Sequence, residues 1–320
     1  MTSYVGRRLL MMIPVIVIVT AVLFVLRQAT PGDPATVAVG QETQLSKEEY
    51  EATLESLRAR YDLDKPLPVQ YALWAGRAAI GDLGRSYRSN QPVREAIIER
   101  LPVTLELGVL SLILSWVIAV PAGVIAAKNR NKWPDLGANF VGLLGLSLPN
   151  IWVAFVLIYI LGVKLEWLPP SGYVRFTDDP LGNLKSMTIP VITLGTSGAA
   201  VIMRLTRSSL LEVIAQDYMR TARAKGLHER AILWRHGMRN ALIPIATVVG
   251  LELGGLLGGA FIIEQIFSLP GMGKLAVDAI YARDYPVVQG VLLMSTLTYL
   301  LANFAVDMVY GLLDPRIRYA

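Results

Sequence analysis

Long stretches without a formal charge constrain this chain more than any other feature of its sequence. Five of them are each long enough to cross about 30 Å of hydrocarbon as a helix: residues 9–26, 107–127, 136–163, 186–203 and 285–306. A sixth apolar stretch, residues 241–263, is interrupted by Glu252 and closed by Glu264, and we count it as a span. With 53% hydrophobic residues, 17% charged residues and a mean hydropathy of +0.47, the composition excludes an ordinary soluble protein. The sequence therefore predicts an all-α integral membrane protein with six transmembrane helices.

The positions of Lys and Arg predict which span ends face the cytoplasm, because positive charge near span ends is retained there. Six spans put both termini on one side, and with the N-terminus inside, basic residues far outnumber acidic ones in the cytoplasmic segments. We therefore expect both termini to be cytoplasmic. The sequence pI of about 9.4 is then a consequence of topology, and nucleic acid is not an expected partner. The first span is expected to remain as an anchor, since it is long for a signal core and no small-x-small cleavage pattern follows.

Four segments follow one another along the chain. They are residues 1–29 (N-terminal end and first span), 30–100 (external segment), 101–310 (remaining spans with the loop 204–240) and 311–320 (cytoplasmic tail). In the external segment, Ser46 and Glu49 form a capping box, and apolar residues recur at helical spacing behind them. We predict a small helical subdomain inserted after the first span, with an unstructured loop as the alternative.

Two spans carry residues that interrupt an apolar helix. Pro149 and Asn150 lie in the third span, where carbonyls freed by the proline must find partners in protein or in a cavity. This kink is either a packing feature or part of a translocation pathway. Glu252 lies in the fifth span, where a carboxylate is costly unless paired, protonated or hydrated. It is either a structural partner or a pathway residue.

The fifth span also carries a strip of small residues. Gly250, Gly254 and Gly258 recur every four positions, so another helix backbone can approach this strip closely. We predict helix packing there, with a partner in this chain or in another subunit.

The loop 204–240 contains a segment that is typical of a short, self-contained helix. Asp217 can serve as its N-cap, and residues 218–225 make about two turns. Lys225 suits the negative end of the helix dipole, and Gly226 can take the left-handed exit. The sequence predicts a helix here, exposed on the cytoplasmic side.

Small side chains at Thr221, Ala222 and Ala224 keep this helix slim. It is therefore expected to enter a groove on a soluble partner. The alternative is a surface helix whose basic residues only follow the positive-inside rule.

The stretch Arg220–Gly226 resembles the coupling motif, often called the EAA loop, of binding-protein-dependent ABC importer permeases. Its form is similar to that of the dipeptide, oligopeptide, glutathione and nickel branch, in the first of the two permease subunit types. Other stretches resemble the same branch: residues 31–34, 101–108, 239–244, 270–273, 283–290 and 314–318. Two departures are visible, because Arg220 stands where the general motif has glutamate, and Glu252 stands where a neutral amide is usual.

The resemblance implies a type I ABC importer permease fold in a bacterial inner membrane and a division of labour among subunits. The expected partners are a second homologous permease, two ATP-binding subunits that hold ATP and Mg, and an external substrate-binding protein. This chain would form half of the translocation pathway and bind no cofactor. Peptides, including di- and oligopeptides or glutathione, are the expected substrates, and nickel chelates or oligosaccharides are alternatives.

The resemblance also implies roles for individual residues. ATPase coupling falls to Asp217, Tyr218, Met219, Arg220, Thr221, Ala222, Arg223, Ala224, Lys225 and Gly226. Docking of the binding protein falls to Pro270, Gly271, Arg283, Asp284 and Tyr285. The pathway candidates are Pro149, Asn150 and Glu252.

Catalytic chemistry is not expected in this chain. The nearest phosphate-loop candidate, residues 271–274, has Ser268 in place of the first glycine and Leu275 where Ser or Thr should bind magnesium. His228 and Glu229 begin like a zinc protease motif, but Ile232 occupies the second histidine position. The absence of cysteine removes thiol chemistry and Cys-ligated metals.

Two other classes of protein compete with the permease interpretation. In a self-sufficient secondary transporter or channel, Glu252 would carry ions or protons, and the chain would transport alone. A membrane enzyme would need several polar residues converging at one depth, and the sequence contains no such group.

Overall fold

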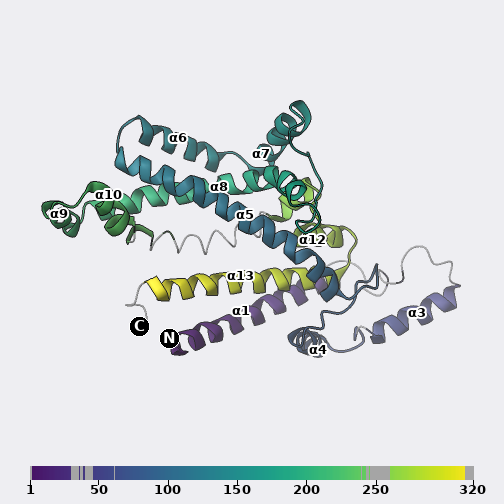
Figure 1. Cartoon of the computed structure of the whole chain (residues 1–320). Helices are drawn as coiled ribbons and strands as arrows, with labels where there is room; N and C mark the ends of the chain where they lie inside the picture. The colour runs from purple at the N-terminus through teal and green to yellow at the C-terminus, as the bar shows by residue number, and fades with distance from the viewer. Residues whose placement is uncertain are drawn as a thin grey trace. The chain divides into compact units, whose positions relative to one another are not determined.

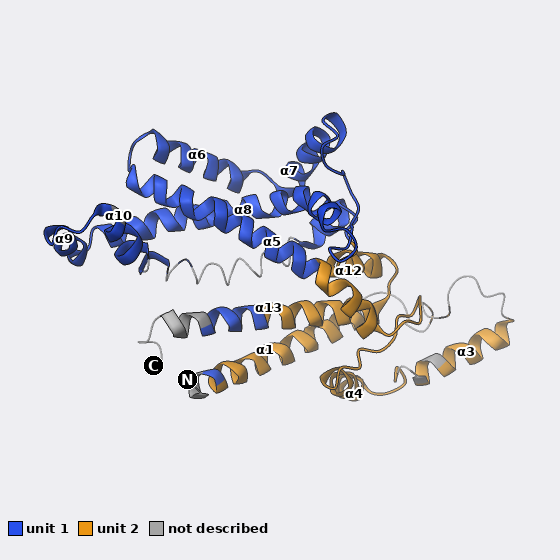
Figure 2. Ribbon diagram, viewed as in Figure 1, with its two compact units in different colours: residues 1–5, 104–269, 301–320 blue, residues 6–103, 270–300 orange. Residues whose placement is uncertain are grey.

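The described part of the chain is helical. The computed structural model describes residues 2–29, 36, 39, 46–60, 62–238, 240–242, 245 and 260–313. Within these residues no strand is formed, and one isolated antiparallel bridge joins Arg85 to Pro92. The chain divides into two units (Figure 2), which are residues 1–5, 104–269 and 301–320 for unit 1, and residues 6–103 and 270–300 for unit 2.

The helices follow the order labelled in Figure 1. They are α1 (Thr2–Ala29), α3 (Lys47–Arg60), α4 (Leu67–Ala79), α5 (Val93–Lys128), α6 (Trp133–Ser147), α7 (Asn150–Leu157), the π-helical segment η1 (Ile158–Lys164), α8 (Pro180–Ile214), α9 (Asp217–Ala224), α10 (Glu229–Ala231), the π-helical segment η2 (Ile232–Met238), α12 (Met272–Tyr281) and α13 (Tyr285–Leu313).

Four helices are long and apolar enough to cross a membrane. They contain Val5–Gln28, Val93–Lys128, Pro180–Ile214 and Tyr285–Met308. The first, second, fourth and sixth predicted spans are thus confirmed as long apolar helices. The fifth predicted span lies largely outside the described residues, although residues 260–266 at its end are helical. The predicted total of six spans therefore stays a prediction.

The third predicted span is a bent helix pair instead of one helix. Helix α6 ends at Ser147, and the chain turns by 100° before the α7–η1 segment. Leu148 is extended, with φ −83° and ψ 125°, as expected for a residue before proline. Pro149 is the N-cap residue of α7, so its missing N–H removes no helical hydrogen bond. The predicted kink is present, and it is sharp enough to make this either a broken span or a re-entrant segment.

Helix α8 is the centre of unit 1. Of its most apolar window, 67% is buried, compared with 17% for α1. It contacts α6, α7 and η2, and its approach to α5 is close because a Cβ on Gly195 would lie 2.9 Å from the Ser111 carbonyl oxygen. The Ser115 hydroxyl donates to the Gly195 carbonyl across the same contact at 2.6 Å. A closely packed core around α8 therefore leads directly into the loop that follows it.

Unit 2 contains the helices α3 and α4 of the segment 30–100, and the position of this segment outside the membrane stays a prediction. The capping box is formed, because Glu49 N–H donates to Ser46 Oγ at 3.3 Å and Ser46 N–H donates to Glu49 Oε2 at 3.0 Å. A second helix, α4, follows, and its residue Tyr71 has a hydroxyl 3.0 Å from Thr20 Oγ1 of α1. Helix α4 is therefore anchored on the first span.

Candidate functional site

The segment that follows α8 forms a separate short helix, as the sequence predicts, but it begins one residue earlier than expected. Gln216 is the N-cap residue, with φ −69° and ψ 150°, and it makes no side-chain capping bond. Asp217 is therefore the first helical residue and not the N-cap, which corrects the prediction. Its carboxylate still lies in the first turn, where negative charge interacts favourably with the helix dipole.

The end of α9 has the predicted left-handed glycine. Gly226 has φ +76°, its N–H donates to the Arg223 carbonyl at 2.9 Å, and the Leu227 N–H donates to the Ala222 carbonyl at 3.3 Å. These two bonds define a Schellman motif. No atom lies within 4 Å of a Cβ placed on Gly226. Glycine is thus favoured by the backbone conformation and not by lack of space.

The two faces of α9 have different surroundings. Met219 (0% exposed) and Ala222 (9% exposed) pack against Ile232 of η2, with Ile214 of α8 beside them. The rest of the helix surface is exposed: Asp217, Tyr218, Arg220, Thr221, Arg223 and Ala224. The small size of Ala222 therefore serves packing within this chain, and its part in ATPase coupling stays a prediction. Thr221 and Ala224 are the small residues on the outer face.

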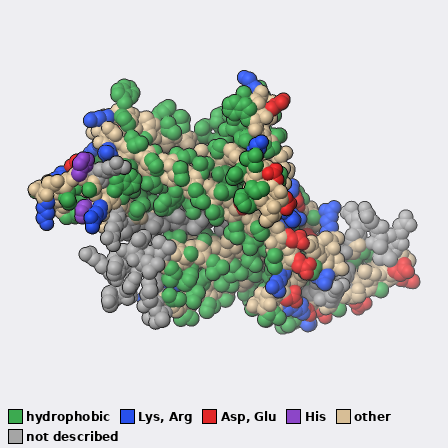
Figure 3. Space-filling model, in the orientation of Figure 1, with side chains coloured by type: hydrophobic (Ala, Val, Ile, Leu, Met, Phe, Trp, Pro, Cys, Tyr) green, Lys and Arg blue, Asp and Glu red, His purple; other side chains and the backbone are tan. Residues whose placement is uncertain are grey.

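Polar contacts around α9 are few and lie at the surface. Asn240 Nδ2 donates to the Tyr218 hydroxyl at 2.8 Å, and Arg223 Nε lies 2.8 Å from Glu229 Oε1. Exposed ion pairs contribute about 0 to 1 kcal/mol, so the packing of Met219 contributes more to the position of α9. Figure 3 shows Lys, Arg and His side chains gathered over the end of unit 1 that contains α9. The outer face of α9 is therefore exposed and basic, while its inner face packs against apolar side chains.

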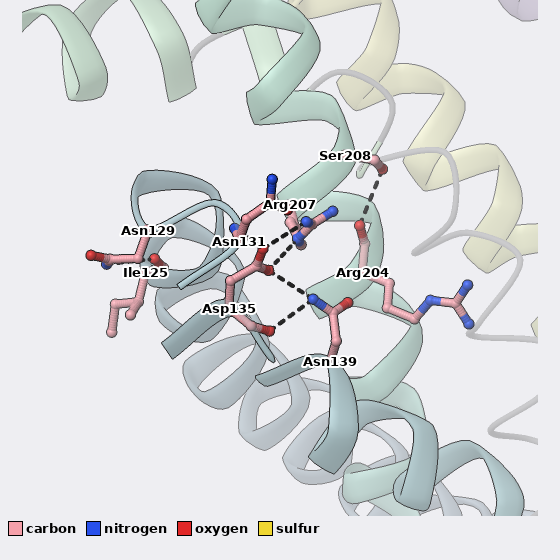
Figure 4. Close-up of polar contacts among 8 residues, drawn as sticks. All are labelled: Ile125, Asn129, Asn131, Asp135, Asn139, Arg204, Arg207 and Ser208. Carbon is pink, nitrogen blue, oxygen red and sulfur yellow. Dashed lines mark hydrogen bonds and ion pairs between the residues drawn. The ribbon is translucent and has the colours of Figure 1, made fainter. Parts of the chain in front are cut away.

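A buried ion pair joins α6 to the last part of α8 (Figure 4). Asp135 is 1% exposed, and its carboxylate accepts from Arg207 Nε at 2.5 Å and Arg207 Nη2 at 2.8 Å. The same carboxylate accepts from Asn131 N–H at 2.8 Å and from Asn139 Nδ2 at 2.7 Å. Arg207 lies two helical turns before the end of α8, so the pair links the start of α6 to the helix that leads into α9.

Sequence reasoning missed this ion pair. Asp135 and Arg207 are 72 residues apart, and in the sequence each contributes only to the charge balance of the segments predicted to be cytoplasmic. The available signal was weak: Asp135 is an acidic residue directly after the basic stretch Lys128–Lys132.

The pathway and packing candidates are only partly described. Pro149 is exposed and Asn150 half-buried at the corner between α6 and α7. The other candidates of these two groups lie outside the described residues: Glu252, Gly250, Gly254 and Gly258. Their roles stay predictions.

The five candidates for docking a binding protein lie in unit 2 and differ in exposure. Asp284 is buried, and its carboxylate accepts from the Ser86 hydroxyl and from the Tyr87 N–H at 3.1 Å. Tyr285 and Gly271 are also buried, and Gly271 is the N-cap residue of α12. Pro270 and Arg283 are exposed, and Arg283 has φ +55°. Asp284 thus holds the chain after α4 against the start of α13, while Pro270 and Arg283 are accessible.

Comparison with protein families gives two matches that cover almost the whole chain. Residues 119–319 match the family described as binding-protein-dependent transport system inner membrane component. Residues 1–108 match the N-terminal region of binding-protein-dependent transport system membrane components.

Full-length relatives carry transport names. A peptide transport system permease protein of Brucella abortus is 42% identical over 319 residues, covering 100% of both chains. The oligopeptide transport system permease protein AppB of Bacillus subtilis is 39% identical over 322 residues, and the glutathione transport system permease protein GsiC of Escherichia coli is 39% identical over 319 residues. Each of these two matches also covers 100% of both chains.

A solved structure shares the fold. Inward facing conformations of the MetNI methionine ABC transporter match 68% of this chain and 96% of theirs, with a TM-score of 0.57 and 19% sequence identity. At this identity the match concerns the fold alone.

Proposed function

The chain belongs to the family of binding-protein-dependent transport system inner membrane components, and on that premise we propose that it imports peptides as one of two permease subunits of an ABC importer. It is a multi-pass inner membrane protein. In the proposed assembly a second homologous permease completes the pathway, two cytoplasmic subunits bind ATP and Mg, and an external protein delivers the substrate. Both termini face the cytoplasm, and this chain hydrolyses no ATP.

The observation that carries the proposal is the two-sided construction of α9. Its inner face is fixed by the fully buried Met219, so a force applied to the outer face is passed to η2 and α8. Its outer face offers Arg220, Thr221 and Ala224 to a partner. A short helix that is held on one side and exposed on the other can act as a rigid connection between an ATPase and the spans. In the proposed mechanism, closure of the ATPases on ATP displaces α9 and thereby α8.

Peptide is proposed as substrate because the full-length relatives are named for peptide, oligopeptide and glutathione transport. We expect the external binding protein to select the substrate. Ligand retained by the purified binding protein would therefore identify the peptide class.

Reconstitution of the importer tests the proposed division of labour. Proteoliposomes are prepared with the complete set of subunits, with the ATPases omitted, and with this chain alone, and uptake of labelled peptide is measured with and without ATP. Uptake is expected only with all subunits, the binding protein and ATP. Uptake by this chain alone would contradict the proposal and favour a self-sufficient transporter.

A further inference from the structure

A cavity of about 250 Å³ lies within unit 2, at the end of α1. Three arginines line it, namely Arg27, Arg77 and Arg85, together with Trp74, Tyr87 and Gln70. The acidic residues Asp62 and Asp82 also line it. The cavity therefore combines a positive lining with amphipathic aromatic side chains.

The acidic residues of the cavity are already occupied by other donors. Asp62 Oδ1 lies 2.6 Å from Lys65 Nζ, and Asp62 Oδ2 lies 2.7 Å from Arg77 Nη2. Asp82 Oδ1 accepts from the Gly84 N–H at 3.0 Å. Neither aspartate pairs with Arg27 Nε or Nη2, so the described lining does not neutralise this arginine.

Arg27 is the unsatisfied group of this cavity. Its Nε and Nη2 atoms are buried and have no hydrogen-bond partner among the described residues. Buried guanidinium donors without an acceptor are costly, and planar anions such as carboxylate or tetrahedral ones such as phosphate are their usual partners. Among the described residues of the lining, no anionic oxygen therefore accepts from Arg27.

The position of Arg27 along the chain indicates where that acceptor comes from. The charge-free stretch of the first span runs over residues 9–26, and Arg27 is the next residue. A residue at this place lies at the boundary between hydrocarbon and headgroups, where arginines interact with lipid phosphate. On the face of α1 turned away from Arg27, Val22 and Val25 are 51% and 63% exposed, whereas Leu23 and Phe24, one turn below Arg27, are buried.

Helix α4 beside this cavity has the properties of an interfacial helix. It is bonded to α1 through Tyr71, and it leaves Leu67 and Val69 52% and 43% exposed. Trp74 lines the cavity from the same helix, and tryptophan is enriched at membrane interfaces. Exposed apolar side chains next to basic ones are typical of helices that lie in the headgroup region.

From these observations we propose that the cavity at Arg27 binds the headgroup phosphate of one phospholipid. Arg27 donates to the phosphate oxygens, and Arg85 adds positive charge. This role is independent of the proposed transport mechanism. It would tie the external subdomain to the membrane surface.

Native mass spectrometry of the purified importer tests the lipid site. The complex is delipidated in detergent and titrated with dioleoyl phosphatidylglycerol, and bound lipids are counted for wild type, Arg27→Gln, Arg27→Lys and Arg94→Gln. Arg94 is an exposed arginine of unit 2 that does not line the cavity, so it serves as the matched control. Loss of a charge-assisted bond is expected to weaken binding of one lipid about tenfold in Arg27→Gln. The lipid affinity of Arg27→Lys is expected to lie between those of wild type and Arg27→Gln. The affinity of Arg94→Gln is expected to match that of wild type.

Three results would overturn the proposal. The first is equal lipid binding by wild type and Arg27→Gln. The second is displacement of the lipid by inorganic phosphate at equal concentration, which would assign the cavity to free phosphate. The third is weaker binding of the external binding protein to Arg27→Gln with lipid binding unchanged, which would assign it to an acidic protein surface.

The variants remain informative if one of them folds poorly. Because Nε and Nη2 of Arg27 have no described partner, Arg27→Gln should unfold at the wild-type temperature in lipid-free detergent, and added phosphatidylglycerol should stabilise it less than wild type. If Arg27→Gln does not assemble, Arg27→Lys decides the question, and wild-type lipid affinity in that variant would overturn the proposal.

Discussion

The end of α9 depends on the backbone conformation of one residue, Gly226. Gly226 takes φ +76° with no neighbouring atom in the way of a Cβ. A β-branched residue in this conformation is strained by about 1 to 2 kcal/mol, whereas asparagine tolerates it. Substitutions at this position therefore change the backbone turn without creating a steric clash.

Gly226→Val is expected to separate ATP hydrolysis from uptake. Strain at the exit displaces the outer face of α9, and a loss of about 1.4 kcal/mol in docking would lower uptake about tenfold. Membrane insertion should be unchanged, because the residue lies outside the described long apolar helices. Peptide uptake and ATP hydrolysis in proteoliposomes measure the two effects.

The matched variant Gly226→Asn keeps access to the left-handed conformation. It should retain most of the uptake per ATP hydrolysed. Equal losses in the valine and asparagine variants would show that strain is not the cause, and normal uptake in both would remove this turn from the coupling mechanism.

Asp62 gives the segment that contains α4 a defined response to acid. The bond from Lys65, with a further one from Arg77, holds the pKa of Asp62 below its ordinary value of 3.8. A carboxyl whose pKa is lowered by folding stabilises the folded form above its unfolded pKa, and this contribution is lost as pH falls through the lowered value. The segment around α4 should therefore loosen as pH falls from about 4 to the lower folded-state pKa of Asp62.

Hydrogen exchange of residues 62–79 between pH 6 and pH 3, corrected for intrinsic rates, measures this effect. In Asp62→Asn, the acid-dependent increase in exchange should disappear, and residues 62–79 should exchange faster than in wild type already at pH 6. The exposed Asp64 provides a control, and Asp64→Asn should behave as wild type. An identical pH profile in Asp62→Asn and wild type would contradict the assignment.

Among elements, the link between α6 and α8 rests on one buried ion pair. Asp135 has a 2% exposed side chain and Arg207 a 23% exposed one. Removing one member of such a pair leaves a buried charge uncompensated, which costs about 3 kcal/mol. Because Asp135 is the more buried member, loss of Arg207 leaves the more costly charge behind.

Arg207→Ala is expected to lower the stability of the purified complex by about that amount, about 3 kcal/mol. The double variant Asp135→Asn with Arg207→Ala should recover part of the loss, because it removes the unpaired carboxylate. Thermal unfolding of wild type, both single variants and the double variant forms a cycle that measures the coupling. Strict additivity of the two single effects would contradict a direct pair.

The elements differ in how far the sequence could predict them. The capping box at Ser46 and the left-handed exit at Gly226 depend on residues within one turn, so local chemistry was sufficient. The start of α9 was misplaced by one residue, because Gln216 and Asp217 are both polar and either can precede the first turn. Pro149 predicted a break, but its angle of 100° depends on how α6 packs against α8.

Long-range contacts account for most of what the sequence did not predict. Met203 comes within 2.5 Å of a Cβ placed on Gly142, so the spacing of α6 and α8 depends on residues far apart in the chain. The Asp135–Arg207 pair and the packing of Ala222 also depend on contacts between different elements of the chain. Periodicity identifies an apolar helix, but it does not identify the helix it packs against.

For the molecule as a whole, family membership and local geometry support one account of coupling. The family has membrane components that work with a binding protein. The described part of this chain contributes long apolar helices, a central α8 and an exposed α9 fixed by Met219 and Ala222. The account requires the outer face of α9 to touch an ATP-hydrolysing subunit.

Cross-linking from Thr221 tests that requirement most directly. The chain contains no cysteine, so Thr221→Cys introduces a unique thiol in this subunit that can carry a photoactivated cross-linker. Asp178→Cys, in an exposed loop before α8, is the control. The account predicts that the Thr221 label captures an ATPase subunit, with a yield that changes on adding ATP, while the Asp178 label does not. Absence of any ATPase adduct from Thr221 in an importer that transports peptide would contradict it.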